Sequence, residues 1–204
     1  GGKLSVDDPL IQFVPEFVNS MREDVLIKHL LTFTVDFQLR LSANKNKSPQ
    51  EILELIFTSE FGVKPGEKFF YHNSSSLLLG LVVERITGKQ IDELAQEVFF
   101  SPLKMSSTTF HPEAIEKTLI VPTEFDEWRG RLIHGEVHDE SAYVLRPEMI
   151  TGHAGLFSTA PDLLSFMEML LHNGALHGRE YLSSSRVKDM YTNQWPDKEF
   201  AHGL

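Results

Sequence analysis

The sequence has no cysteine, no long apolar run and no excess of basic residues, and each absence excludes a class of protein. Without cysteine the chain has no disulfide, no thiol nucleophile and no cysteine-ligated zinc site. No apolar stretch approaches the roughly 20 residues that a membrane-spanning helix requires. A chain of 204 residues buries roughly 70% of its unfolded surface. We therefore expect a globular domain that is held by its core alone and has no membrane segment.

Acidic residues outnumber basic ones, with 29 Asp and Glu against 19 Lys and Arg and a formal net charge of −10 at pH 7. An acidic surface repels the phosphate backbone of nucleic acids, so we expect no nucleic-acid partner. The sequence begins at Gly1 without a methionine and ends at Leu204 without a tail. We interpret it as a piece of a longer polypeptide, so a missing targeting segment says nothing about the compartment.

Helical patterns dominate the chain. The run Ser48-Pro49-Gln50-Glu51 predicts a helix start, because the serine can cap the helix and the glutamate completes a capping box. The strongest helix is predicted over residues 74–87, with Gly88 as its C-terminal stop. Gly80 lies inside this helix, where a close backbone contact would explain a glycine. Further helices are predicted over residues 25–31, 90–99 and 184–191, and another is predicted to open at Thr159-Ala160-Pro161-Asp162 and to end at Asn173-Gly174.

The remaining segments carry weaker signals. Residues 1–20 predict an extended lead-in along the surface, and residues 106–158 predict irregular structure with short strands near 107–110 and 156–158. The apolar face of the helix that follows Thr159 is predicted to consist of Leu163, Leu164, Met167, Leu170 and Leu171. The fold class predicted from these patterns is mainly α with a few short strands.

The segment Tyr71-His72-Asn73 lies between a Pro-Gly turn and the strongest helix. A phenol and an amide two residues apart can project into one cleft, where the phenol exchanges a proton and the amide holds a substrate carbonyl or amide. An ordinary phenol has a pKa near 10, so it acts as a base near neutral pH only where cations stabilise the phenolate. The alternative is a tyrosine packed at the helix entry and an asparagine that caps the helix. The spacing alone favours this alternative.

Several segments around this motif resemble, in order, the class C β-lactamases and their esterase and peptidase relatives. They include PGEKFFYHNSS at residues 65–75, GKLSVDDP at 2–9 and GHAGLFSTA at 152–160, together with residues 78–84, 87–89, 100–105 and 108–110. The resemblance implies a serine hydrolase that works through an acyl-enzyme. It also implies a small-molecule or peptidoglycan-like substrate, no cofactor and an extracytoplasmic location.

The resemblance assigns roles to residues of this chain. Tyr71 is implied to be catalytic and to help move the proton of the serine hydroxyl. Asn73 is implied to orient the substrate. His153 lies in a turn that borders the cleft in the family, and it is a further candidate for substrate binding.

The family also requires a Ser-x-x-Lys motif before the segment at residues 2–9, and a Lys-Thr-Gly or His-x-Gly strand near its C-terminal end. We expect both to lie outside this chain, which would leave the chain without its nucleophile and inactive by itself. Three Ser-x-x-Lys matches occur, at Ser42–Lys45, Ser101–Lys104 and Ser185–Lys188. All three fall in the wrong order, and we reject them. The sequence His153-Ala154-Gly155 leads into a helix, so we do not assign it to the C-terminal strand.

One segment departs from the family pattern. Where the family commonly has Leu-Leu-Thr-His-Thr-Ser-Gly, this chain has LLTFTVD at residues 30–36. Asp36 in place of the glycine puts the usual tight turn in doubt and predicts a reshaped wall of the cleft.

His134 and His138, with Glu136 and Asp139, form the alternative of a metal site. Two histidines four residues apart suit a helix, but Gly135 and the lack of periodicity argue against one. We therefore expect no metal, and we interpret this stretch as a polar loop over the cleft mouth that resembles loops of the esterase-like branch.

These observations predict one domain over residues 1–204, the mostly helical central portion of the β-lactamase/transpeptidase-like α/β fold without its N- and C-terminal segments. The predicted function is part of a serine hydrolase that acts on a β-lactam, a D-alanine peptide or a small ester. The alternative is a non-catalytic binding or regulatory relative with the same fold. The sequence leaves the oligomeric state open.

Overall fold

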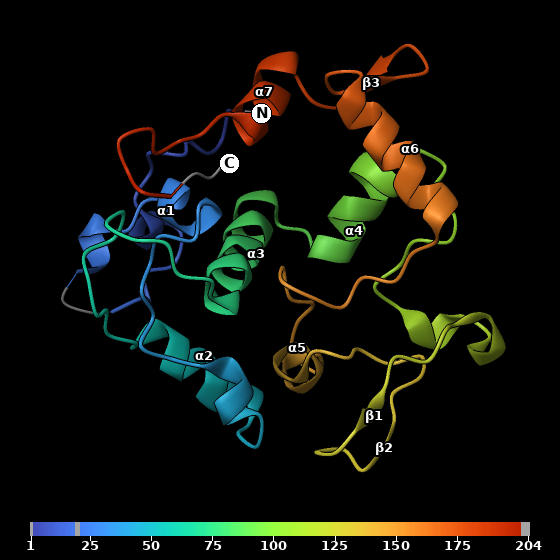
Figure 1. The fold of residues 1–204 in the computed structure, drawn as a ribbon, viewed down its shortest axis with the longest axis horizontal. Helices are drawn as coiled ribbons and strands as arrows, with labels where there is room; N and C mark the ends of the chain where they lie inside the picture. The colour runs from blue at the N-terminus through green and yellow to red at the C-terminus, as the bar shows by residue number, and fades with distance from the viewer. Residues whose placement is uncertain (1, 19–20, 201–204) are drawn as a thin grey trace.

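The computed structural model describes residues 2–18 and 21–200, so the two chain ends interpreted above lie outside the described residues. Helices dominate the described part (Figure 1). The α-helices are α1 (Ile27–Leu31), α2 (Pro49–Phe57), α3 (Asn73–Thr87), α4 (Ile91–Ala95), α5 (Glu140–Leu145), α6 (Ala160–Leu171) and α7 (Ser184–Tyr191). The strands are β1 (Phe125–Asp126), β2 (Arg131–Leu132), β3 (Ala175–Leu176) and β4 (Arg179–Glu180). Within these residues no helix is long and apolar enough to cross a membrane.

Local capping explains where the predicted helices begin and end. The capping box at α2 forms as predicted, since the Ser48 Oγ accepts from the Glu51 N–H at 3.3 Å and a Glu51 carboxylate oxygen accepts from the Ser48 N–H at 2.8 Å. Gly88 ends α3 with a φ of +70°, a left-handed conformation that favours glycine. The helix predicted over residues 90–99 is an α-helix only to Ala95, and residues 96–100 widen into a π turn.

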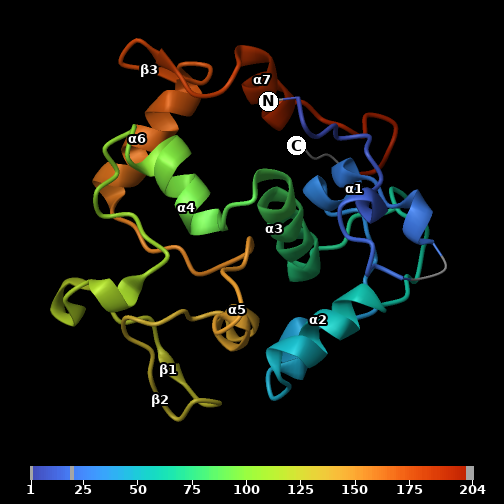
Figure 2. The ribbon, with the colours of Figure 1, turned by 180° about the vertical axis from the view of Figure 1, so that it is seen from behind.

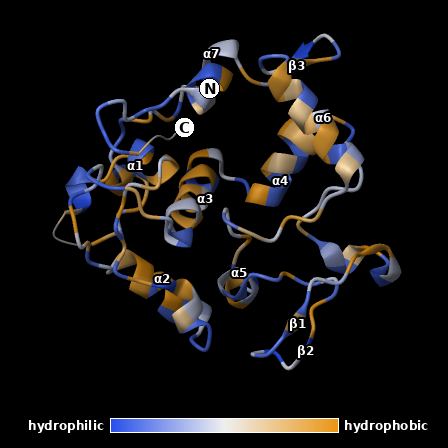
Figure 3. Ribbon diagram, viewed as in Figure 1, coloured by the Kyte–Doolittle hydropathy of each residue, from blue (hydrophilic) through white to orange (hydrophobic). Residues whose placement is uncertain are grey.

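Helix α3 lies near the centre of the molecule and packs on α1 and α4 (Figures 1 and 2). It buries Leu77, Leu78 and Val82 completely. These side chains belong to a cluster that we call the N-terminal core, which draws on α1, α2, α3, α5 and the segment before α1. Apolar colour on α2 and α3 marks part of this cluster (Figure 3). Because Leu10, Val14 and Phe17 are fully buried in it, the predicted surface lead-in is wrong for those positions.

A smaller cluster, the α6 cluster, is built from Phe100, Leu103, Met105, Met169 and Leu176. The predicted apolar face of α6 is wrong, because Leu163, Leu164, Met167 and Leu171 are 46–78% exposed. Two side chains fix the rotation of the helix instead. The buried Asp162 carboxylate accepts from the Ser107 N–H and the Thr108 hydroxyl, both at 2.8 Å. Phe166 packs edge-on against Phe99 with ring centroids 5.6 Å apart.

The strands are two small antiparallel hairpins, and neither lies where strands were predicted. In the β3–β4 hairpin, Leu176 pairs with Arg179 across His177 and Gly178, both of which have positive φ, as a two-residue type I′ turn requires. The segments near residues 107–110 and 156–158 form no strand, but Thr109 and Phe157 exchange two hydrogen bonds of 2.9 Å as an isolated bridge. The region predicted to be irregular also contains α5.

The predicted close contact at Gly80 is confirmed. A Cβ on Gly80 would lie 3.2 Å from the backbone nitrogen of Gly152, and a Cβ on Gly152 would lie 2.4 Å from the carbonyl oxygen of Ser76. The segment around residue 152 therefore lies directly on the backbone of α3. This contact brings His153 toward the start of α3.

Candidate active site

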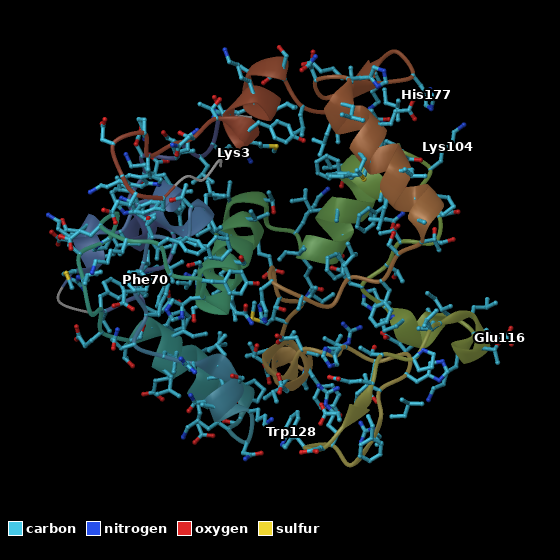
Figure 4. All side chains as sticks on the ribbon, in the orientation of Figure 1. Lys3, Phe70, Lys104, Glu116, Trp128 and His177 are labelled. Atoms are coloured by element: carbon cyan, nitrogen blue, oxygen red, sulfur yellow. The ribbon has the colours of Figure 1, made fainter. Side chains whose placement is uncertain are left out.

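A cleft of about 560 Å³ opens where the chain enters α3. Its wall is formed by the segment before α3, by residues 39–42 and by the start of α5. Figure 4 labels Phe70 on the first of these segments. The lining residues are Leu39, Arg40, Leu41, Ser42, Phe69, Phe70, Tyr71, His72, Asn73, Ser74, Asp139 and Ser141.

Tyr71 lies at this cleft with its side chain largely in solvent. It is 73% exposed, so the alternative of a tyrosine packed at the helix entry is wrong. One face of its ring stacks on Phe33, with centroids 5.2 Å apart and planes at 21°. The Phe70 N–H donates to the Phe33 carbonyl at 2.7 Å, which ties the two segments together. The ring of Tyr71 is thus held by Phe33 while most of the side chain stays exposed at the cleft.

The segment that departs from the family pattern forms its turn at Phe33, which has a φ of +53°. Such a conformation is costly for a residue other than glycine, by roughly 1 kcal/mol.

Asp36 is almost buried, and its carboxylate lies 3.9 Å from Nε2 of His72. Burial lowers the pKa of His72 and the charge of Arg40 lowers it further, against the opposite effect of Asp36. Arg40 supplies positive charge to the cleft.

Asn73 is the first residue of α3, and His72 occupies the N-cap position without a side-chain cap. The Asn73 side-chain nitrogen instead donates to Oδ2 of Asp139 at 3.2 Å. The alternative in which Asn73 caps the helix is therefore wrong. Its amide is held across the cleft wall by a residue from the start of α5.

Asp139 is the centre of a hydrogen-bonded group behind Asn73. Its Oδ1 accepts from the Ser141 hydroxyl at 2.6 Å, from the Ala142 N–H at 2.8 Å and from Nε2 of His153 at 3.1 Å. Burial alone would raise the pKa of Asp139, but the hydrogen bonds from His153, Ser141 and Ala142 outweigh it and hold that pKa well below its usual range. Asp139 is therefore charged at neutral pH.

His153 lies in this group and not on the cleft surface. Its side chain is only 3% exposed, and it is not among the lining residues. The structure thus brings Tyr71 and Asn73 to one cleft and places His153 behind them. The sequence analysis named Asp139 only in the alternative of a metal site and did not name Ser141 as a site residue. The sequence did contain a signal for Asp139, because aspartate is a favoured N-cap residue. Asp139 is the N-cap of α5, where its side chain accepts from the Ala142 N–H.

The sequence model of one family, described as Beta-lactamase, matches residues 1–204. The chain belongs to the beta-lactamase family. The resemblance identified from the motifs is confirmed, and so is the mainly helical form of the fold.

Relatives of the family match nearly all of this chain. A protein of Escherichia coli K12 named "Putative D-alanyl-D-alanine carboxypeptidase" is 28% identical over 99% of this chain and 52% of its own length. The octameric penicillin-binding protein homologue from Pyrococcus abyssi is 25% identical with a TM-score of 0.70, over 99% of this chain and 47% of that one. A class C beta-lactamase shares the fold with a TM-score of 0.74 at 18% identity, over 100% of this chain and 53% of that one. The chain thus spans about half the length of the curated relatives it matches.

The three rejected Ser-x-x-Lys matches occupy different places in this beta-lactamase-family fold. Ser42 is exposed on the short helix Leu41–Asn44 and lines the cleft. The order of the motifs in the sequence did not predict this position at the cleft. Its partner Lys45 is bound to Glu140 at 3.2 Å and lies over the ring of Trp128, in the turn between β1 and β2 (Figure 4). Ser101 follows the π turn, and Ser185 lies on α7.

The two histidines of the metal alternative have separate partners. Nε2 of His134 lies 2.7 Å from the Ile120 carbonyl, and Nε2 of His138 lies 2.7 Å from a Glu124 carboxylate oxygen. The stretch that carries them is not helical. Across residues 2–18 and 21–200, no group of three or more acidic or histidine side chains is arranged to hold a metal ion.

Proposed function

We propose that this chain supplies the Tyr71–Asn73 wall of the active site of a serine hydrolase. The hydrolase works through an acyl-enzyme on a β-lactam, a D-alanine peptide or a small ester. The nucleophilic serine comes from a Ser-x-x-Lys other than the three in this chain, so the chain alone does not turn over substrate. Membership of the beta-lactamase family supports the reaction class, and the carboxypeptidase name of the E. coli relative supports the D-alanine peptide.

The observation that carries the proposal is the joint presence of Tyr71 and Asn73 at one cleft, where the Tyr71 side chain is largely exposed and the Asn73 amide is bound to Asp139. A phenol that exchanges a proton with a serine hydroxyl must be reachable from the cleft, and Tyr71 is. Arg40 lines the same cleft and contributes positive charge to it. Lys45 is occupied by Glu140, so the pair Ser42–Lys45 does not offer an available amine.

The test compares the chain with a polypeptide that contains it and has the length of its relatives. Both are assayed with nitrocefin and with a nitrophenyl ester. We expect turnover only from the longer polypeptide, and a loss of about a hundredfold or more in its kcat for Tyr71→Phe, the usual effect of removing a general acid or base. Tyr191→Phe is the matched control, because Tyr191 is 71% exposed on α7, outside the cleft.

Each outcome decides one part of the proposal. Turnover by the chain alone that Tyr71→Phe abolishes would contradict the external nucleophile and leave the role of Tyr71 standing. A longer polypeptide with no turnover, and without acylation by a β-lactam, would favour the non-catalytic relative. Equal rates for Tyr71→Phe and Tyr191→Phe would contradict the role of Tyr71.

A further inference from the structure

The backbone turns at Phe33 in a conformation that phenylalanine rarely adopts. Four described residues other than glycine have a positive φ, and they are Phe33, Lys104, Asn173 and His177. Asparagine and histidine are among the residue types that tolerate this region best, whereas a bulky apolar side chain there is an outlier. Phe33, with a φ of +53°, is the only apolar residue of these four. Such strain persists only where the surrounding structure enforces it, and it is concentrated at functional sites.

Hydrogen bonds and burial on both sides hold Phe33 in this turn. Its carbonyl oxygen accepts from the Phe70 N–H at 2.7 Å, and its own N–H donates to the Leu30 carbonyl at 3.3 Å. The next residue, Thr34, is fully buried and donates its N–H to the His29 carbonyl at 2.9 Å. The backbone of Phe33 therefore cannot relax without breaking these contacts.

This turn determines where the ring of Phe33 lies. The ring stacks on Tyr71, with centroids 5.2 Å apart and planes at 21°, and it meets the ring of Phe69 edge-on at 6.3 Å. In the part of the chain that the structure describes, Phe33 is the only ring on which Tyr71 stacks, and the Tyr71 hydroxyl makes no hydrogen bond. Because Tyr71 is 73% exposed, packing against other side chains restricts its rotamer little. The stack on Phe33 is thus the contact that selects the orientation of Tyr71.

We propose that Phe33 is a positioning residue, which holds the Tyr71 phenol at the cleft in the orientation that proton transfer requires. A phenol exchanges a proton only when its oxygen lies within hydrogen-bond reach of the reacting group, so the population of one rotamer limits the rate. The strained turn is kept because it presents the ring of Phe33 to Tyr71. The effect on turnover rests on the proposed function, whereas the orientation of Tyr71 does not.

The orientation is tested first without a substrate, by NMR of the chain with ¹³C-labelled tyrosine. The chain has 4 tyrosines, and the Tyr71 signal is identified by its loss in Tyr71→Phe. We expect the Tyr71 ring protons to lie upfield in the wild type, because the ring current of Phe33 acts on them. Phe33→Leu should move these protons downfield and average the χ1 coupling constants. Phe33→Tyr keeps a ring at this position and should keep the wild-type signals.

Phe99→Leu is the matched control, because it removes an aromatic pair outside the cleft, with Phe166 at 5.6 Å. Its Tyr71 signals should stay at the wild-type position. Tyr71 signals that are the same in wild type and in Phe33→Leu would overturn the positioning role. If Phe33→Leu does not fold, Phe33→Asn decides the same question, because asparagine tolerates a positive φ and has no ring.

The ring and the turn are separated by the kcat of the longer polypeptide. If Phe33 served only the turn, Phe33→Asn would be at least as active as wild type, because it relieves the backbone strain. We expect instead that Phe33→Asn and Phe33→Leu both lower kcat by roughly two- to tenfold, the usual worth of an aromatic pair. KM should stay nearly unchanged, because substrate binding is not what the stack supports. Phe33→Tyr should restore the wild-type kcat, and a wild-type kcat in Phe33→Asn would overturn the effect on turnover.

The two measurements separate this inference from the proposed function. If the longer polypeptide does not turn over substrate, the proposed function fails, and the NMR signals of Tyr71 still decide whether Phe33 orients it. If Tyr71→Phe abolishes turnover but the Phe33 variants change neither the Tyr71 signals nor kcat, the positioning role fails and the proposed function stands.

Discussion

Helices α3 and α6 both carry a strong apolar pattern in the sequence, yet they bury their side chains in different ways. On α3, the apolar side chains Leu77, Leu78 and Val82 are fully enclosed. On α6, most of the predicted face is exposed. Leu170 of that face packs against the α6 cluster as predicted, together with Phe166 and Met169, which were not predicted. A helix that is apolar around most of its circumference has more than one face that could be buried. The periodicity therefore identifies the helix but not its packed side.

The largest effect is expected from shortening a buried side chain on α3, which tests the difference between the two helices directly. Leu78→Ala removes a fully buried side chain from the N-terminal core and should lower the free energy of unfolding by about 2–5 kcal/mol. Leu164→Ala on α6 is the control, because that side chain is 62% exposed, and it should change stability by less than about 0.5 kcal/mol. Urea unfolding measures both. A loss in Leu164→Ala as large as in Leu78→Ala would show that this face of α6 is covered in solution.

The second prediction tests the buried side of this comparison at His29. This residue lies on α1, which packs on α3. Burial, together with the charge of Lys28, lowers the pKa of His29 to about 4. Between pH 4 and 6.5 the unfolded chain then holds more protons at this residue than the folded chain, so stability rises with pH across this window and is complete above it. The free energy of unfolding should therefore rise by about 3 kcal/mol across this window.

The variant His29→Gln should lose that part of the pH dependence, because glutamine does not titrate. Urea unfolding of wild type and variant from pH 4 to pH 8 measures the difference between the two slopes. At pH 8 the two proteins should differ by the lost packing of His29 on Trp195, whose rings are 5.8 Å apart, and by the lost hydrogen bond from the Leu26 N–H to Nδ1 of His29 at 3.2 Å. Parallel curves over the whole range would rule out a titrating His29.

The smallest effect is expected at the contact between α3 and the segment around residue 152. Gly152→Ala should lower stability by about 1–3 kcal/mol, since the new Cβ would lie 2.4 Å from the Ser76 carbonyl oxygen. The variant should also shift the NMR signals of His153. Gly130→Ala is the control, because that glycine has open space around it and a φ of +64°, so it adds backbone strain without a clash. If Gly152→Ala is as stable as wild type, α3 is not tightly packed on this side.

The sequence determined those features whose causes are local. The start of α2 follows from a capping box within four residues, and the end of α3 follows from a glycine that adopts a positive φ. Gly80 indicated a close contact, because glycine is unfavourable inside a helix unless a neighbouring backbone requires it there. The family motifs placed Tyr71 and Asn73 before α3.

Only the tertiary structure decided the features that depend on distant partners. Asp162 and Phe166 set the rotation of α6 through contacts with residues 107–108 and 99, which no periodicity encodes. Tyr71 stacks on Phe33 and stays largely exposed, whereas the spacing alone favoured a ring packed at the helix entry. Asn73 meets Asp139 across 66 positions of sequence. Capping is set by neighbours in the chain, but the orientation of an amide is set by whichever group the fold brings beside it.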